Sequence, residues 1–187
     1  MSLNTWVETL VTQQGAGTSF GTYTTAKTVI NAQALYTIPP GFWAIGKTLE
    51  IDVMGEISNL VTTPGTITMQ VMMGSIVAFT TGAMQMSTTA HTALPFWLKV
   101  QVTCRAVGAS TSANLMGQGV MFSRTVSVSG ADVTGGHNFL MAPNTTPAVG
   151  TGFDSTIANI LDFWSGFSIS DAANVIRVSQ YTVKSLN

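Results

Sequence analysis

Apolar and polar positions alternate with a period of two along most of the chain from about residue 35 onward. The longest run spans residues 96–106. Its apolar positions are Phe96, Leu98, Val100, Val102, Cys104 and Ala106, and its intervening positions are Trp97, Lys99, Gln101, Thr103 and Arg105. Side chains of a β-strand point alternately to opposite sides, so this run predicts a long strand with one buried face.

Residues 49–57 repeat the alternation and place Glu50, Asp52 and Glu56 on the polar side. Hydrolysis of a sugar would need two inward carboxylates on neighbouring strands. These three share one outward face instead, which favours a solvated or interface face over a catalytic pair.

Turn signals separate the alternating runs. Thr62-Thr63-Pro64-Gly65 predicts a hairpin into a strand at 67–73, because proline presets φ and glycine supplies positive φ. Gly74-Ser75 predicts a second turn, into a returning strand at 76–79. Further strands are expected at 114–128, 139–142, 157–169 and 175–186.

Two local features modify this pattern. Gly117 and Gly119 predict a bulge or a sharp bend in the strand that contains them. Asp154, followed by Ser-Thr and then by apolar residues, is a candidate N-cap for a short helix.

Eight or more short strands with turns between them indicate an all-β fold, an antiparallel, jelly-roll-like β-sandwich over residues 31–187. Residues 1–30 alternate poorly and are expected to form an N-terminal arm or an irregular first strand. The predicted core contains Trp43, Ile51, Val53, Val71, Leu98, Val100 and Val102.

Composition changes the picture through its shortage of charge. Only 8% of the residues are charged, against about 25% in an ordinary soluble domain. The mean hydropathy is +0.35, yet no apolar stretch approaches the roughly 18 residues of a spanning helix. So neutral a surface resists association poorly, and we expect much of it to be covered by other protein.

Net charge and cysteine content exclude further classes. A net charge of −1 offers no basic face for a phosphate backbone, so neither nucleic acid nor membrane is an expected partner. Cys104 is the single cysteine and is interpreted as a small buried apolar residue. No basic and apolar leader follows Met1, so we expect synthesis in a cytoplasm.

The segment 41–48 fits the phosphate-binding loop pattern G-x-x-x-x-G-K-[ST] through Gly41, Gly46, Lys47 and Thr48. That chemistry needs a buried strand before the loop and a helix after it. Here two prolines precede the loop and a strand pattern follows it. The match is therefore interpreted as a false positive, and no nucleotide or other cofactor is expected.

Catalytic and metal-binding signals are weak. His91 and His137 have no nucleophile or carboxylate at a recognisable spacing. They also lie too far apart in sequence to indicate a metal site. We therefore expect no enzyme activity, no catalytic residue and no metal.

One stretch resembles a known family. The residues are Tyr36-Thr37-Ile38-Pro39-Pro40-Gly41-Phe42-Trp43-Ala44-Ile45-Gly46-Lys47-Thr48-Leu49-Glu50-Ile51, then Gly55-Glu56-Ile57-Ser58-Asn59 and Pro64-Gly65-Thr66-Ile67-Thr68. This run is similar to a domain of structural proteins of tailed bacteriophages, and the resemblance extends through 94–107 and, more weakly, to 180–187. It implies a capsid decoration or minor head or tail protein with a jelly-roll-like domain, often trimeric.

The predicted function is therefore a non-enzymatic decoration or cement protein. It would be made in the bacterial host cytoplasm and located in the virion, with its own copies and the major capsid protein or other virion proteins as partners. Its expected contact residues are Trp6, Trp97, Lys99, Gln101 and Arg105. The alternative is a tail-tip or fibre module that binds a host glycan or protein, for which Asp162, Phe163 and Trp164 are candidates.

Overall fold

The computed structural model describes residues 7–127 and 139–186, and these residues form fourteen strands and one 3₁₀ turn, η1 (Ala32–Ala34). The strands are β1 (Glu8–Thr12), β2 (Phe20–Gly21), β3 (Lys27–Thr28), β4 (Tyr36–Ile38), β5 (Thr48–Asn59), β6 (Thr66–Met73), β7 (Ile76–Thr80), β8 (Met84–Met86), β9 (His91–Ala106), β10 (Asn114–Ser123), β11 (Val126–Ser127), β12 (Phe139–Ala142), β13 (Asn159–Phe167) and β14 (Val175–Ser185). No helix among these residues is long and apolar enough to cross a bilayer.

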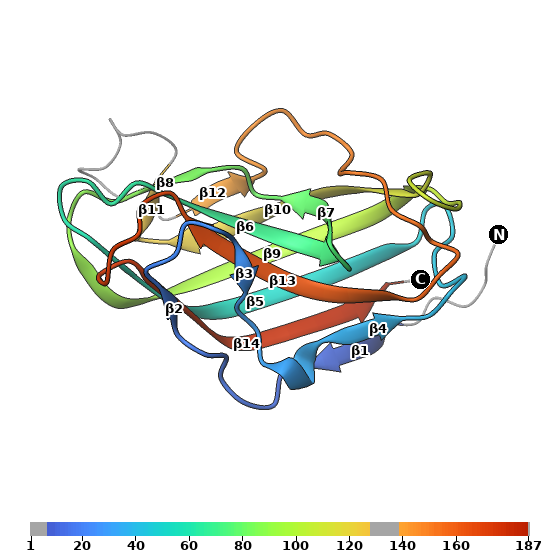
Figure 1. Ribbon diagram of the computed structural model, residues 1–187, viewed down its shortest axis with the longest axis horizontal. Helices are drawn as coiled ribbons and strands as arrows, with labels where there is room; N and C mark the ends of the chain where they lie inside the picture. The colour runs from blue at the N-terminus through green and yellow to red at the C-terminus, as the bar shows by residue number, and fades with distance from the viewer. Residues whose placement is uncertain (1–6, 128–138, 187) are drawn as a thin grey trace.

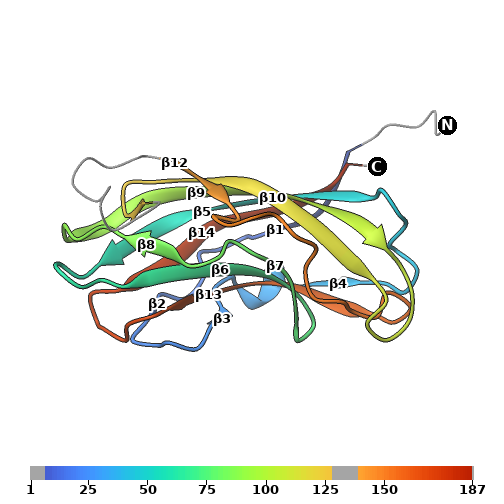
Figure 2. The same ribbon diagram turned by 90° about the horizontal axis from the view of Figure 1, so that it is seen from above.

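The strands form two antiparallel sheets that pack face to face (Figures 1 and 2). Sheet A has the order β1-β14-β5-β9-β10-β12, and β2 also pairs with β14. Sheet B has the order β11-β8-β6-β13-β3, with β4 on β13 and β7 on β6. The chain passes repeatedly from one sheet to the other, and the prediction of an all-β, antiparallel β-sandwich of eight or more strands is confirmed.

Alternation along each strand places one set of side chains between the sheets. On β9, Phe96, Leu98, Val100, Val102 and Cys104 are all buried, while Trp97 and Gln101 are exposed. The predicted core is confirmed, since all seven of its residues are buried: Trp43, Ile51, Val53, Val71, Leu98, Val100 and Val102.

The hairpin predicted at residues 62–65 is wrong. β5 pairs with β9 and β14 in sheet A, whereas β6 belongs to sheet B, so the turn carries the chain across the sandwich. Two buried asparagines hold this crossing. The Asn59 side chain donates to the carbonyls of Ser87 and Thr89, and the Asn174 side chain donates to the Pro64 carbonyl. The turn at Gly74, by contrast, does join the paired strands β6 and β7.

Two other local predictions are also wrong. The β10–β9 register is continuous from Leu115 to Ser123, so no bulge forms at Gly117 or Gly119, and the register shift of this pair lies between Asn114 and Leu115. A Cβ on Gly117 would meet the Phe79 ring, and one on Gly119 would meet the Lys99 carbonyl oxygen, so these glycines permit close packing instead. Asp154 caps a turn, accepting from the backbone N–H groups of Ser110 and Thr156, and strand β13 follows where a helix was expected.

Residues 7–31 run from sheet A to sheet B along one side of the sandwich. Buried Gln13 holds this segment, since its side chain donates to the Val178 carbonyl and accepts from the Asn31 backbone N–H. β1 pairs with β14 in sheet A, and β3 pairs with β13 in sheet B. The division of the chain at residue 30 stays a prediction.

Candidate interaction surface

The outward side of sheet A carries most of the residues expected to contact a partner. Trp97, Gln101 and Arg105 of β9 are exposed there, and Lys99 is half-buried. Trp6, the fifth predicted contact residue, lies outside the described residues.

Four large apolar side chains form a single cross-strand row over this face. In register, Met54 lies opposite Trp97, Trp97 opposite Phe122, and Phe122 opposite Phe139. Their exposed fractions run from 37% to 54%. We call Met54, Trp97, Phe122 and Phe139 the aromatic row, and it crosses β5, β9, β10 and β12.

Direct contacts fix the rings of the aromatic row. The centroids of Trp97 and Phe122 are 5.4 Å apart in a stacked arrangement, and those of Phe122 and Phe139 are 6.1 Å apart. The Trp97 Nε1–H donates to Asp52 Oδ1 over 3.2 Å. The indole therefore has a defined orientation although much of it faces solvent.

A cluster of ion pairs lies beside the aromatic row. Glu50 is 2.8 Å from the Lys99 ammonium and 3.4 Å from that of Lys184, which also lies 3.6 Å from Asp52. The hydrogen bond from Lys99 lowers the pKa of Glu50, and Glu50 in turn raises the pKa of Lys99. The carboxylates are thus compensated within the face, which leaves the aromatic row as its dominant unpartnered feature.

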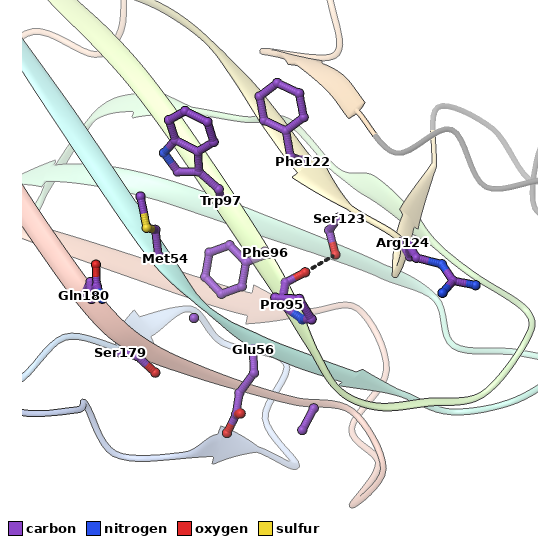
Figure 3. A pocket seen from close by; sticks show the side chains of 12 residues that line it. Met54, Glu56, Pro95, Phe96, Trp97, Phe122, Ser123, Arg124, Ser179 and Gln180 are labelled. Atoms are coloured by element: carbon purple, nitrogen blue, oxygen red, sulfur yellow. Dashed lines mark hydrogen bonds between the residues drawn. The ribbon is translucent and has the colours of Figure 1, made fainter.

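A hollow of about 600 Å³ opens at one side of the aromatic row (Figure 3). Two backbone features shape it: β14 has a register shift between Val178 and Gln180, and Gly55 lies opposite Phe96. A Cβ on Gly55 would clash with the Phe96 ring, so glycine at this position leaves room for that ring at the base of the hollow. Its lining is Met54, Gly55, Glu56, Ala93, Pro95, Phe96, Trp97, Phe122, Ser123, Arg124, Ser179 and Gln180.

The two arginines near this hollow differ in their charge partners. Arg177 Nε lies 3.4 Å from Glu56 Oε1 and compensates that carboxylate. Arg124 is exposed and makes no ion pair with any residue of 7–127 or 139–186. Burial and the nearby charge of Arg124 lower the pKa of His91, which favours the neutral imidazole.

The segment that matches the phosphate-loop pattern lies in the β4–β5 connection and is not followed by the helix that a phosphate-binding loop requires. Strand β5 starts at Thr48, where the motif needs a helix. The Lys47 ammonium lies 3.9 Å from the centroid of the Phe42 ring, and the Gly46 N–H donates to the Cys104 carbonyl. Gly41 and Gly46 both have positive φ, as turns require. The loop therefore forms the turns that lead into β5.

The candidates for a glycan platform do not form one. Asp162, Phe163 and Trp164 lie within β13 rather than on a loop, and the Phe163 ring is buried in the core. The Asp162 carboxylate accepts from Thr28 Oγ1 over 2.7 Å and from Trp164 Nε1 over 2.6 Å. These side chains therefore fasten β3 onto β13.

The remaining candidates for catalysis or metal binding do not come together in the described residues. His91 starts β9, and His137 lies outside the described residues. No group of three or more His, Cys, Asp or Glu side chains gathers in the described ranges. Cys104 is buried, as its place in the alternation predicts.

Sequence reasoning missed Phe122 and Phe139 as parts of the surface. Apart from Gln118, residues 115–122 are apolar or glycine on both faces, so the sequence does not say which side is covered. Only the pairing of β10 with β9 and β12 shows that these rings extend the surface of Trp97.

Comparison with known proteins adds no relative: no model of a protein family matches the sequence, and no curated protein matches it. The likeness to phage structural proteins therefore stays a resemblance of the residues themselves.

Proposed function

We propose that this chain is a non-enzymatic structural protein of a tailed-bacteriophage virion, a decoration protein that binds the assembled head and stabilises it. The observation that carries the proposal is the aromatic row on the outward face of sheet A. Aromatic residues, methionine and arginine are enriched at the centres of protein interfaces, and the row with Arg124 beside it has this composition. A chain with 8% charged residues needs covering of this kind.

The proposed mechanism is thermodynamic. A ligand that binds only the assembled shell lowers the free energy of that state and leaves the free subunits unchanged. Several copies, each contacting more than one shell subunit, would add their contributions through multivalency. The protein would be made in the host cytoplasm and would act as a homo-oligomer, which we propose to be a trimer.

The test is binding to particles. Virions of the phage that encodes the chain are separated into heads and tails, and each fraction is inventoried by mass spectrometry. Heads stripped of the protein are then incubated with purified wild type or with the Trp97→Ala/Phe122→Ala variant. We expect the protein in the head fraction, and we expect the double variant to lose at least tenfold in affinity.

The matched control is Ile160→Ala, because Ile160 is 48% exposed but belongs to sheet B. This control should bind heads as the wild type does. Absence of the protein from heads, or equal binding by the double variant and the wild type, would overturn the proposal.

The hollow favours one alternative, a tail-tip or fibre module that recognises a host glycan. Trp97 offers a flat ring, and the exposed side chains of Ser179 and Gln180 could bond to hydroxyl groups at the rim. Location in the tail fraction, together with binding on a glycan array that Trp97→Ala abolishes, would support this alternative over head decoration.

A further inference from the structure

The residues on either side of Arg124 hold it at the edge of the hollow. It follows the last residue of β10, and its neighbours Ser123 and Thr125 are buried. Their hydroxyl oxygens are 2.8 Å apart in a hydrogen bond, and the Thr125 N–H also donates to Ser123 Oγ. Figure 3 shows Arg124 on the side of the hollow where β10 ends. These hydrogen bonds fix the position of the Arg124 backbone.

The charged groups around the hollow leave an excess of positive charge. Glu56 and Arg177 compensate each other, and the lowered pKa of His91 favours its neutral form. Arg124 therefore leaves one uncompensated positive charge at the rim within the described residues. The complementary group is a carboxylate, which a guanidinium binds through two parallel hydrogen bonds.

The interior of the hollow calls for an apolar group. Met54, Pro95, Phe96 and Trp97 line it together with Phe122. Its volume of about 600 Å³ lies in the range of pockets that enclose a ligand group. A large apolar side chain that enters here would cover the Phe96 and Trp97 rings.

The aromatic row favours a polypeptide over a sugar as the occupant. It continues past the hollow to Phe139, and the neighbouring Met141 is also about half exposed. A ligand confined to the hollow would leave these side chains in water, whereas a polypeptide surface can cover them as well.

We infer that this hollow receives an apolar side chain of a virion protein and that Arg124 binds a carboxylate carried next to that side chain. The inference rests on the proposed function and names the chemistry of the partner. The apolar contact supplies affinity, and the Arg124 contact supplies orientation and selects against partners without the acid.

The experiment measures binding of full-length variants to the stripped heads at two salt concentrations. Arg124→Glu reverses the charge at the hollow. Lys47→Glu also reverses a positive charge, but in the β4–β5 connection, where the Lys47 carbonyl accepts from the Cys104 N–H near the other end of β9. Lys47 likewise makes no ion pair within 7–127 and 139–186. Arg124→Lys keeps the charge and removes the planar fork.

We expect Arg124→Glu to weaken binding at least tenfold and Lys47→Glu to weaken it less than threefold. Arg124→Lys should fall between the wild type and Arg124→Glu, and the wild type should bind more weakly at higher salt. Circular dichroism and thermal unfolding of each variant show that the fold is retained.

The outcomes separate this inference from the function it rests on. Normal binding by Arg124→Glu, with loss in the Trp97→Ala/Phe122→Ala variant, would overturn the inference and leave head decoration standing. Competition by an acidic sugar, or burial of the aromatic row in a dimer of this chain measured by sedimentation, would also overturn it. Failure of the wild type to bind heads would overturn both.

Discussion

The Trp97 indole stacks on the Phe122 ring with centroids 5.4 Å apart and planes 21° apart, while both side chains stay more than one third exposed. The two residues lie directly opposite each other on β9 and β10. Their mutual contact and the hydrogen bond from Trp97 to Asp52 restrict ring motion. A partner that covers these rings therefore orders side chains that are already constrained, which reduces the entropy cost of binding.

A double-mutant cycle at Trp97 and Phe122 should report this contact in the isolated protein. We expect a coupling free energy of about 0.5–1.5 kcal/mol, as for other aromatic pairs, from urea unfolding of the two alanine variants and their combination. Trp97 and Ile160, which lie on different sheets, serve as the control pair and should be additive. Additive effects at Trp97 and Phe122 would contradict the stacked geometry.

Gly119→Ala should destabilise the sandwich by about 1–3 kcal/mol, because the new methyl group would meet the Lys99 carbonyl oxygen and the Val100 Cα. These are backbone atoms of the neighbouring strand and cannot move without disturbing the pairing. Gly15→Ala is the matched control, since its methyl group would find only ordinary contact with the Asn31 side chain at 3.7 Å. Thermal unfolding of the two variants compares them, and equal melting temperatures would be inconsistent with the close β9–β10 approach.

Stability should fall in acid through Glu50. Its pKa is lowered by Lys99, so the unfolded state binds more protons than the folded state as the pH drops below about 4.5. The contribution is present above that pH and is lost as the pH falls through the folded-state pKa. We expect it to be under about 1 kcal/mol, because the partner ammonium groups face solvent. Urea midpoints at pH 6 and pH 3 should differ less in Glu50→Gln than in the wild type, and equal differences in the two proteins would contradict this role of Glu50.

Tyr181→Phe should leave stability unchanged or raise it by up to about 1 kcal/mol, because the buried Tyr181 hydroxyl has no hydrogen-bond partner among the described residues. Burial, and secondarily the charge of Asp162, raises the pKa of this phenol well above its usual range. Stability should therefore decline as the pH rises above about 10 in the wild type and less so in Tyr181→Phe. Ultraviolet titration should show equal tyrosine ionisation in both folded proteins; an extra ionising tyrosine in the folded wild type would refute the assignment.

The sequence was sufficient to predict which residues of a strand share a face, but not which strands are neighbours. The alternation on residues 49–57 and 96–106 correctly predicted two half-buried strands and their core residues. The turn at 62–65 was misinterpreted because its chemistry is the same in a hairpin and in a crossing between sheets. Gly65 does have positive φ, yet the direction of the chain after this turn depends on Asn174, which is distant in sequence.

The candidate surface was predictable only in its central strand. Trp97 stood out because it interrupts a polar face, whereas the row it belongs to comes from pairing between strands distant in sequence. Arg124 carried no sequence signal at all. Its importance depends on the ion pair between Glu56 and Arg177, which are 121 positions apart and meet only because β5 and β14 are adjacent.

The position of β14 constrains how the protein can be made. This strand lies between β1 and β5, so it separates two segments that precede it in the chain by more than 100 positions. The β5 edge of sheet A therefore stays unpaired during translation until residues 175–185 have emerged. A nascent chain that is truncated before residue 175 exposes that edge permanently, which makes prematurely terminated products of this gene candidates for aggregation and rapid proteolysis.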